Sequence, residues 1–277
     1  MEHEETSPKF KTTESLAKMS TSKINILITG ASSGIGEALA YHYASEKYHL
    51  ILTGRDAQRL QKVCDQCVKK AASVSSHVID VTDEKAMKEF LSAQDDITPI
   101  DIVVANAGIS GGTGGLKDKS GTALIKQIRN IYGINIIGVL NTLDPLMDRM
   151  VARRSGQIVF ISSMAAFAPW PGAPAYSSSK AAIRFLGNSL RGALAPYNVF
   201  VSVVYPGFVK SRITDQNKFP MPFFKNGEYA ARKIAKGVEK KSVSIAFPWQ
   251  MVVLTTLMRL IPTGIMIKIN SKMPKKQ

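Results

Sequence analysis

Tyr176 and Lys180 lie four residues apart in the segment AYSSSKAAIRFL, and Ser163 comes thirteen residues before Tyr176, at the end of the apolar run QIVFISS. Residues at i and i+4 share one face of a helix, so the ammonium group of Lys180 can lie beside the phenol of Tyr176. A tyrosine with an ordinary pKa of about 10 transfers protons poorly at neutral pH, and a nearby cation lowers that pKa. The spacing therefore predicts a proton-transferring phenol; the alternative is a solvated pair on a helix surface.

A glycine-rich turn lies near the start of the chain. Residues 24–29 (INILIT) form a continuous apolar run, typical of a buried parallel strand, and are followed by GASSGIG and the helical EALAYHYA. Glycines let the backbone approach a pyrophosphate, and a helix N-terminus offers it unpaired N–H groups. Strand, glycine turn and helix together predict a dinucleotide site, whereas glycines alone would indicate only a tight turn.

The motifs TGxxxGxG at 29–36 and YxxxK at 176–180 resemble those of the short-chain dehydrogenase/reductase family, and the resemblance runs from about residue 23 to about residue 247. Further matching residues follow in the family's order: Asp80, Val81, Asn106, Ala107, Gly108, Asn135, Ser163, Pro206 and Gly207. The resemblance implies hydride transfer between a nicotinamide cofactor and a carbon that bears oxygen. It also implies a homodimer or homotetramer.

The family's catalytic residues map onto four positions. The resemblance implies that Ser163 hydrogen-bonds the substrate carbonyl oxygen, that Tyr176 protonates it, and that Lys180 lowers the tyrosine pKa and holds the nicotinamide ribose. Asn135, in the helical stretch IYGINIIGVL, resembles the asparagine that positions a water in a proton relay; a polar residue tolerated in mid-helix is the alternative. Ser162 is the rival of Ser163, but strand neighbours face opposite sides and the spacing to Tyr176 selects Ser163.

Cofactor choice depends on the residue after the second predicted strand, Arg55. An arginine there pairs with an adenosine 2′-phosphate, whereas an acid would bind the ribose diol. We therefore expect NADP(H) rather than NAD(H), with the neighbouring Asp56 as the alternative ribose ligand. The resemblance implies that the cofactor is also held by Tyr176, Lys180 and the following residues: Gly30, Ser32, Ser33, Gly34, Ile35, Gly36, Asp80, Val81, Asn106, Ala107, Gly108, Pro206, Gly207, Val209 and Ser211.

The substrate walls of the family correspond to residues 164–174 and to the stretch after Ser211. Both stretches are largely apolar and aromatic, and such linings bury hydrophobic ligands. We expect an apolar ketone, aldehyde or alcohol as the substrate, with contacts from Phe167, Trp170, Phe219 and Phe223. Core packing is the alternative for each of these side chains.

Two other function classes are compatible with parts of this pattern. A non-catalytic NADP-binding or sensor protein would normally lack one of Ser163, Tyr176 and Lys180, and all three are present. A sugar-nucleotide epimerase or dehydratase shares the tyrosine and lysine, but it usually carries TGxxGxxG and a larger C-terminal domain. An oxidoreductase is therefore the favoured prediction.

The length of 277 residues and the alternation of strand and helix patterns predict one α/β domain, a doubly wound Rossmann-type fold with a mostly parallel seven-stranded sheet and helices on both faces. Strands are expected at 24–29, 48–53, 74–79, 100–105, 156–162, 199–205 and 243–247. Residues 1–22 read as a polar tail without a signal peptide, which predicts a cytoplasmic enzyme. Residues 23–247 would form the catalytic domain and residues 248–277 an extension.

No metal site is expected. The four histidines are scattered, and Cys64 and Cys67 form a single CxxC pair, whereas structural zinc takes four ligands. Two free thiols in a helix, suited to a reducing compartment, are the preferred interpretation.

The net charge of +15 is concentrated near the end of the chain, where residues 205–277 hold fourteen Lys and Arg and three Asp and Glu. Aromatic residues are not interleaved with these cations as a base-stacking surface requires, so we expect no nucleic acid partner. Residues 242–258 carry no charge, but this run is too short for a typical membrane span. It predicts a segment that covers the cleft or a subunit interface, or one that lies in a membrane surface beside Lys268, Lys272, Lys275 and Lys276.

Overall fold

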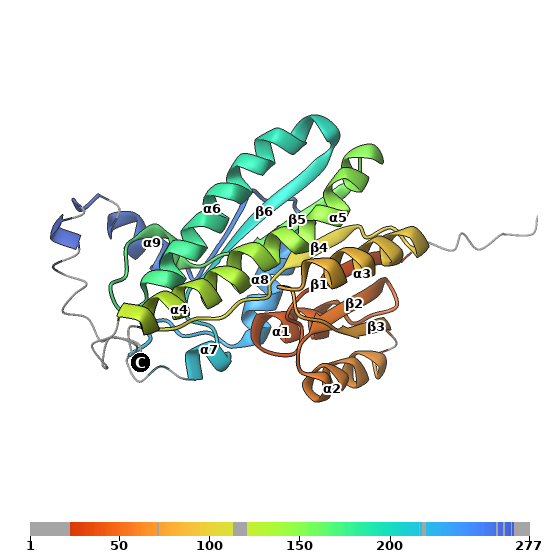
Figure 1. The fold of residues 1–277 in the computed structure, drawn as a ribbon, viewed down its shortest axis with the longest axis horizontal. Coiled ribbons are helices and arrows are strands. Elements are labelled where there is room, and N and C mark those ends of the chain that lie inside the picture. Colours follow the sequence, from red (N-terminus) through yellow and green to blue (C-terminus); the bar gives the residue numbers. More distant parts are fainter. Residues whose placement is uncertain are drawn as a thin grey trace, which may run out of the picture.

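A computed structural model describes residues 23–70, 72–112, 121–215, 217, 220–258, 260–262, 264–266 and 268 (Figure 1). Residues 1–22, Phe219, Lys272, Lys275 and Lys276 lie outside these described residues, so the predicted polar tail stays a prediction. Within the described part of the chain, seven strands form one parallel sheet in the order β3-β2-β1-β4-β5-β6-β7. The strands are β1 (Ile24–Ile28), β2 (Tyr48–Gly54), β3 (Ser73–Val78), β4 (Ile102–Ala105), β5 (Gly156–Ile161), β6 (Val199–Pro206) and β7 (Ser244–Phe247).

The predicted doubly wound fold is confirmed, because helices cover both faces of this sheet (Figure 1). The α-helices are α1 (Gly34–Tyr43), α2 (Ala57–Val68), α3 (Glu84–Ile97), α4 (Gly121–Tyr132), α5 (Gly138–Ala152), α6 (Pro174–Leu194), α7 (Arg212–Asp215), α8 (Gly227–Glu239) and α9 (Trp249–Met258). A π-helical turn, η2 (Gly133–Ile137), joins α4 to α5.

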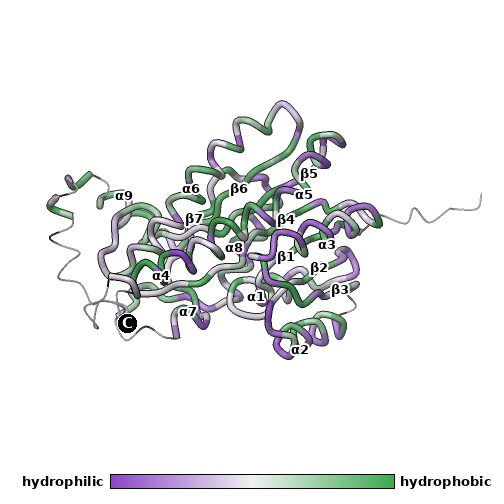
Figure 2. Tube along the Cα trace, viewed as in Figure 1, coloured by the Kyte–Doolittle hydropathy of each residue, from purple (hydrophilic) through white to green (hydrophobic). Residues whose placement is uncertain are grey.

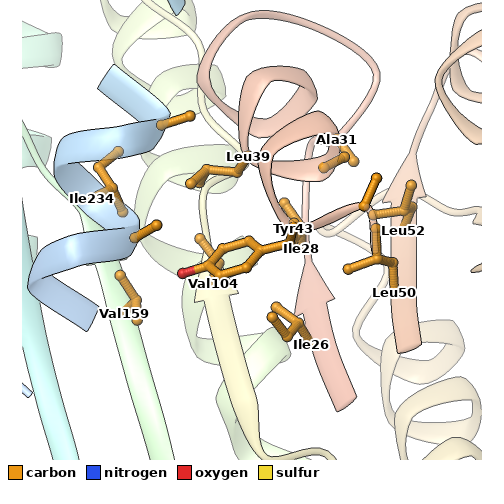
Figure 3. Close-up of a cluster of buried hydrophobic side chains, with 14 of the residues drawn as sticks. Ile26, Ile28, Ala31, Leu39, Tyr43, Leu50, Leu52, Val104, Val159 and Ile234 are labelled. Atoms are coloured by element: carbon orange, nitrogen blue, oxygen red, sulfur yellow. The ribbon is translucent and has the colours of Figure 1, made fainter. Parts of the chain in front are cut away.

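Alternation along the buried strands divides the core into two layers. Ile26 and Ile28 of β1 point into one layer, whereas Leu27 between them points into the other. The first layer packs under α1, α2 and α8; Figure 3 shows Leu39 of α1 and Ile234 of α8 among the side chains of β1, β4 and β5. The second layer packs under α3, α5 and α6. The central strands are apolar over nearly their full length because both of their faces are covered (Figure 2).

The strand order reverses between β1 and β4. At such a point the loops that follow neighbouring strands turn to opposite faces of the sheet and leave a crevice at the carboxyl ends, where ligands bind in open α/β sheets. The glycine turn follows β1, Arg55 follows β2, and Asn106 to Gly108 follow β4. The fold therefore brings the separate sequence motifs to one edge of the sheet.

Candidate active site

The turn between β1 and α1 depends on its glycines. Gly30 and Gly34 have φ angles of +65° and +61°, a region that L side chains rarely adopt. A Cβ on Gly36 would lie 2.5 Å from both the Gly30 carbonyl oxygen and the Asn106 side-chain nitrogen. The Asn106 amide group already donates to the Thr29 carbonyl oxygen at 2.8 Å and to the Gly30 carbonyl oxygen at 3.2 Å. The turn is thus pinned to the end of β4 without room for a side chain.

Substitution Gly36→Ala should lower the free energy of unfolding by about 1–3 kcal/mol, because the added methyl group overpacks this contact. It should also weaken nicotinamide cofactor binding, since the turn must move. Gly192→Ala is the matched control: its Cβ meets no atom within 4 Å and it lies in α6, so about 0.5–1 kcal/mol of stabilisation is expected. Thermal unfolding and calorimetric cofactor titration measure both effects; a Gly36→Ala protein as stable as the wild type would contradict the steric argument.

A cleft of about 380 Å³ opens at the carboxyl edge of the sheet. It runs from Arg55 at one end to Tyr176 and Lys180 at the other, which suits an extended dinucleotide with its pyrophosphate at the glycine turn. Most residues predicted to hold the cofactor line it: Gly30, Ser32, Ser33, Gly34, Ile35, Arg55, Val81, Asn106, Ala107, Gly108, Tyr176, Lys180, Pro206, Gly207, Val209 and Ser211. Gly36, Asp80 and Asn135 are not part of its lining; Gly36 lies behind the turn and the other two contact lining residues.

At the Arg55 end of the cleft, each carboxylate has a cationic partner. Nη1 of Arg55 lies 3.2 Å from Oδ2 of Asp80. Burial raises the pKa of Asp80, but bonds from the backbone and hydroxyl of Thr82 and from Arg55 outweigh it and hold that pKa below its usual value. Oδ1 of Asp56 caps α2 by accepting from the Arg59 backbone N–H at 2.9 Å, and its Oδ2 lies 2.9 Å from Nη2 of the same arginine. Both oxygens of Asp56 are therefore engaged by Arg59.

Ser163 and Tyr176 meet at the other end of the cleft. A hydrogen bond with Ser163 lowers the pKa of Tyr176, but burial is the larger effect and the net shift is upward. Nζ of Lys180 donates to the Ile161 carbonyl oxygen at 2.8 Å and lies 5.9 Å from the centre of the Tyr176 ring. Burial lowers the pKa of Lys180 to about 8. The sequence led us to expect that Lys180 lowers the pKa of Tyr176. In this structure burial raises that pKa more than the bond with Ser163 lowers it, and the Lys180 ammonium group bonds a carbonyl oxygen instead.

Ser162 also lines the cleft, but its hydroxyl is engaged by a backbone group. Its hydroxyl donates to the Lys180 carbonyl oxygen at 2.8 Å and so ties β5 to α6. The side-chain oxygen of Ser163 instead accepts from the Ala165 backbone N–H at 3.1 Å, at the start of a short 3-10 turn. The two hydroxyls thus make different contacts, although both serines follow the end of β5 and line the cleft.

Asn135 lies in the π-helical turn η2 rather than in a continuous α-helix, and it is fully buried. Its Oδ1 accepts from the Ile109 backbone N–H at 2.8 Å, and its Nδ2 donates to the Ile109 carbonyl oxygen at 3.0 Å and to the Ser179 hydroxyl at 3.0 Å. A Cβ on Gly108 would lie 3.3 Å from both this Oδ1 and the Lys180 ammonium nitrogen. Asn135 therefore joins the loop after β4 to the helix that carries Tyr176; its role in a water relay stays a prediction.

A second, mainly apolar cavity of about 450 Å³ adjoins the cleft. Ser163 and Tyr176 line both cavities. Trp170 lines this cavity as predicted, whereas Phe167 does not: it packs against Tyr205 and under the Arg184 guanidinium. Phe223 is also outside the lining and is 45% exposed.

Several lining residues escaped the sequence prediction. Arg59 and Thr53 line the cleft, Ile213 and Thr214 line both cavities, and α9 contributes Met251, Leu254, Thr255 and Met258 to the apolar one. Arg59 could have been predicted from its position in the first turn of the helix that follows Arg55. The first part of the apolar extension thus lines the apolar cavity, and whether the extension also meets a subunit or a membrane stays a prediction.

The two cysteines lie buried on α2 and are free thiols, as the sequence suggested. Burial raises the pKa of Cys67 to about 11. Among the described residues, no group of three or more His, Cys, Asp or Glu side chains could hold a metal ion.

Comparison with known proteins places this site in a family. The family model for short chain dehydrogenases matches residues 24–220. An uncharacterised oxidoreductase of Myxococcus xanthus is 36% identical over 237 residues, which cover 85% of this chain and 92% of that protein. Serine 3-dehydrogenase of Rhizobium radiobacter is 34% identical over 190 residues, covering 68% of this chain and 73% of that enzyme.

Solved structures agree on the fold. A short-chain dehydrogenase from Sphingobium yanoikuyae in complex with NADPH has a TM-score of 0.74 at 24% identity and covers 92% of this chain and 98% of its own. A short-chain dehydrogenase/reductase from Burkholderia phymatum in complex with NAD has a TM-score of 0.77 at 21% identity. The match covers 93% of this chain and 99% of that structure's chain. The chain belongs to the short-chain dehydrogenase/reductase family, and it is an oxidoreductase that uses a nicotinamide cofactor on alcohol or carbonyl groups.

Proposed function

We propose that this protein is an NADP(H)-dependent oxidoreductase that interconverts an apolar ketone or aldehyde and the corresponding alcohol. The observation that carries the proposal is that Ser163 and Tyr176 line both the polar cleft and the apolar cavity. A proton donor and a hydroxyl at the junction of two cavities serve a reaction between a molecule in one and a molecule in the other.

We assign the roles of the side chains from the family resemblance, and their positions in the two cavities are compatible with these roles. The bound nicotinamide supplies or accepts the hydride. Ser163 hydrogen-bonds the substrate oxygen, and Tyr176 gives it a proton in the reducing direction or removes one in the oxidising direction. Lys180, bonded to the Ile161 carbonyl oxygen, is fixed beside the phenol and binds the ribose. Met251, Met258 and Trp170 exclude water from the apolar end of the reaction space.

The preference for NADP(H) is supported by the charges at the Arg55 end of the cleft. Asp56, the acid that could bind a ribose diol, is occupied by capping α2 and by pairing with Arg59. Arg59 itself lines the cleft, and its Nε is buried without a hydrogen-bond partner. The two guanidinium groups at this end of the cleft are suited to charge-assisted bonds with a 2′-phosphate.

Arg55→Ala should raise the Michaelis constant for NADPH by at least tenfold, about 1.4 kcal/mol, because a charge-assisted bond to the phosphate is lost. The constant for NADH should change little. Arg59→Ala should shift the preference in the same direction, since it also releases the Asp56 carboxylate. Initial rates with NADPH and with NADH give the two Michaelis constants. If Arg55→Ala raises both constants equally, Arg55 is structural and the NADP assignment is contradicted.

The substrate class is tested by assaying a panel of apolar ketones and secondary alcohols through NADPH absorbance, with NADH in parallel and a set of sugars for comparison. Turnover of sugars but not of apolar carbonyl compounds would overturn the substrate assignment. Cofactor binding without turnover of any compound would favour the non-catalytic sensor function.

We also infer a homodimer or homotetramer. Apolar side chains stay exposed on α4, η2 and α5, where Ile125, Ile137 and Leu140 are 50%, 47% and 42% exposed. Such patches mark protein interfaces. Sedimentation velocity measures the assembly, and Ile137→Glu together with Leu140→Glu should dissociate it.

A further inference from the structure

The outer side of α9 leaves large apolar side chains open to solvent. Met251, Thr255 and Met258 are buried on its inner side and line the apolar cavity. On the outer side Trp249 is 70% exposed and Leu257 is 57% exposed. A helix that is apolar all round is normally buried on all sides, but no residue that the structure describes covers the exposed half of α9.

The apolar surface continues beyond the helix. Leu260 is 78% exposed and Ile265 is 53% exposed. Trp249, Leu257, Leu260 and Ile265, with Val253 at 49%, form what we call the α9 outer surface. It lies at one end of the molecule, far from α3 at the other end (Figure 1). No helix among the described residues is long and apolar enough to cross a bilayer.

The charge of the sequence that follows α9 indicates which partner the α9 outer surface binds. Residues 259–277, which follow α9 directly in the sequence, contain five Lys and Arg and no Asp or Glu. A two-fold contact between copies through α9 would bring together two sequences of this net positive charge, and like charges at an interface are unfavourable. An anionic lipid surface matches both properties, because basic residues are attracted to its charge and apolar side chains enter the acyl boundary. Tryptophan is enriched at that boundary.

The position of Leu254 connects this surface to the cavity. Leu254 lines the apolar cavity and is nevertheless 43% exposed, so the rim of the cavity and the α9 outer surface meet on one helix. We propose that the α9 outer surface docks on an anionic lipid surface and that the apolar cavity receives its substrate from the lipid. The docking proposal depends only on the α9 outer surface. The proposal that substrate enters the cavity from the lipid rests on the proposed function.

Docking is tested by co-sedimentation of the full chain with phosphatidylcholine vesicles, with and without phosphatidylglycerol. The wild type should sediment with the anionic vesicles only, and about 0.5 M salt should weaken the attachment by screening. The double variant Leu257→Glu/Leu260→Glu should lower the partition coefficient at least about tenfold, because it removes apolar burial and adds repelled charges. Ile97→Glu, at a side chain 79% exposed at the end of α3, is the matched control and should bind as the wild type does.

Contact is located by fluorescence. The chain has two tryptophans, so a Trp170→Phe protein reports on Trp249 alone, and brominated lipids in anionic vesicles should quench it. Absence of wild-type binding, equal binding to neutral vesicles, or full binding by the double variant would each overturn the proposal. A double variant that changes oligomeric state while the wild type ignores vesicles would identify a subunit interface instead.

Delivery is tested with one apolar ketone presented in two ways, dissolved in water and embedded in anionic vesicles. The double variant should turn over the dissolved ketone as the wild type does and the embedded ketone at least about tenfold more slowly. Equal rates on the embedded ketone would overturn delivery from lipid. If the wild type binds vesicles but reduces no ketone, the proposed function fails while docking stands.

Discussion

Tyr176→Phe is expected to reduce kcat by about 10²–10⁴-fold, the usual contribution of a positioned acid or base, while the affinity for NADPH changes little. The substitution removes one hydroxyl group from a ring that burial and α6 hold in place, so packing against the cofactor is kept. Proton transfer to the substrate oxygen is lost. Single-turnover rates measure the chemical step, and fluorescence titration with NADPH measures binding.

The matched control is Tyr132→Phe, which removes a phenol hydroxyl 2.8 Å from Ser178 Oγ, outside both cavities. Its kcat should match that of the wild type. A Tyr176→Phe enzyme that keeps more than about a tenth of kcat has lost less than about 1.4 kcal/mol of barrier stabilisation, and the assignment of Tyr176 as the acid would then be wrong.

Lys180→Met should abolish turnover and yet stabilise the cofactor-free protein at neutral pH. Burial lowers the pKa of Lys180 from 10.5 to about 8, so below pH 8 the folded protein holds a charge that would be better solvated in the unfolded chain. This penalty is on the order of 3 kcal/mol. As pH rises from about 8 to 10.5, the unfolded chain keeps the proton and the folded protein releases it, so the wild type gains stability. Above pH 10.5 the penalty is gone.

Denaturant unfolding of the wild type and of Lys180→Met between pH 7 and 11 tests whether the stability difference changes with pH in the predicted direction. The advantage of Lys180→Met should shrink across that window, because the wild type improves while other groups titrate equally in both proteins. Lys180→Arg stays charged over this range and should show no corresponding gain. A constant difference between the wild type and Lys180→Met would show that the buried ammonium group carries no such penalty. A cation retained at this cost fits a site kept for chemistry rather than for stability.

The sheet could be predicted closely because its strands are buried on both faces and so appear as apolar runs between helical patterns. Each expected strand begins and ends within two residues of the observed one. The largest difference is at β4, which starts at Ile102 rather than at residue 100. Ser163, Tyr176 and Lys180 converge as the spacing predicted, since helix and strand periodicity fix which side chains share a face.

The sequence was less informative where contacts between distant parts of the chain determine the position or the partner of a side chain. Nothing local distinguishes Phe167, which stacks on Tyr205, from Trp170, which lines the cavity. The expected effect of Lys180 on the tyrosine pKa did not include the Ile161 carbonyl oxygen, which comes from another strand. Asp56 caps α2 and also forms an ion pair with Arg59. Only the helix cap could be predicted from the sequence.

The apolar cavity is built from two parts of the chain, one inside and one beyond the stretch that matches the family model. Ser163, Tyr176 and Lys180 fall within residues 24–220, the stretch shared with the family model. Met251, Leu254 and Met258, which form the opposite wall, come after it and after the last strand. Exchange of residues 249–258 between relatives is therefore expected to change which substrates are accepted, with Ser163, Tyr176 and Lys180 left in place.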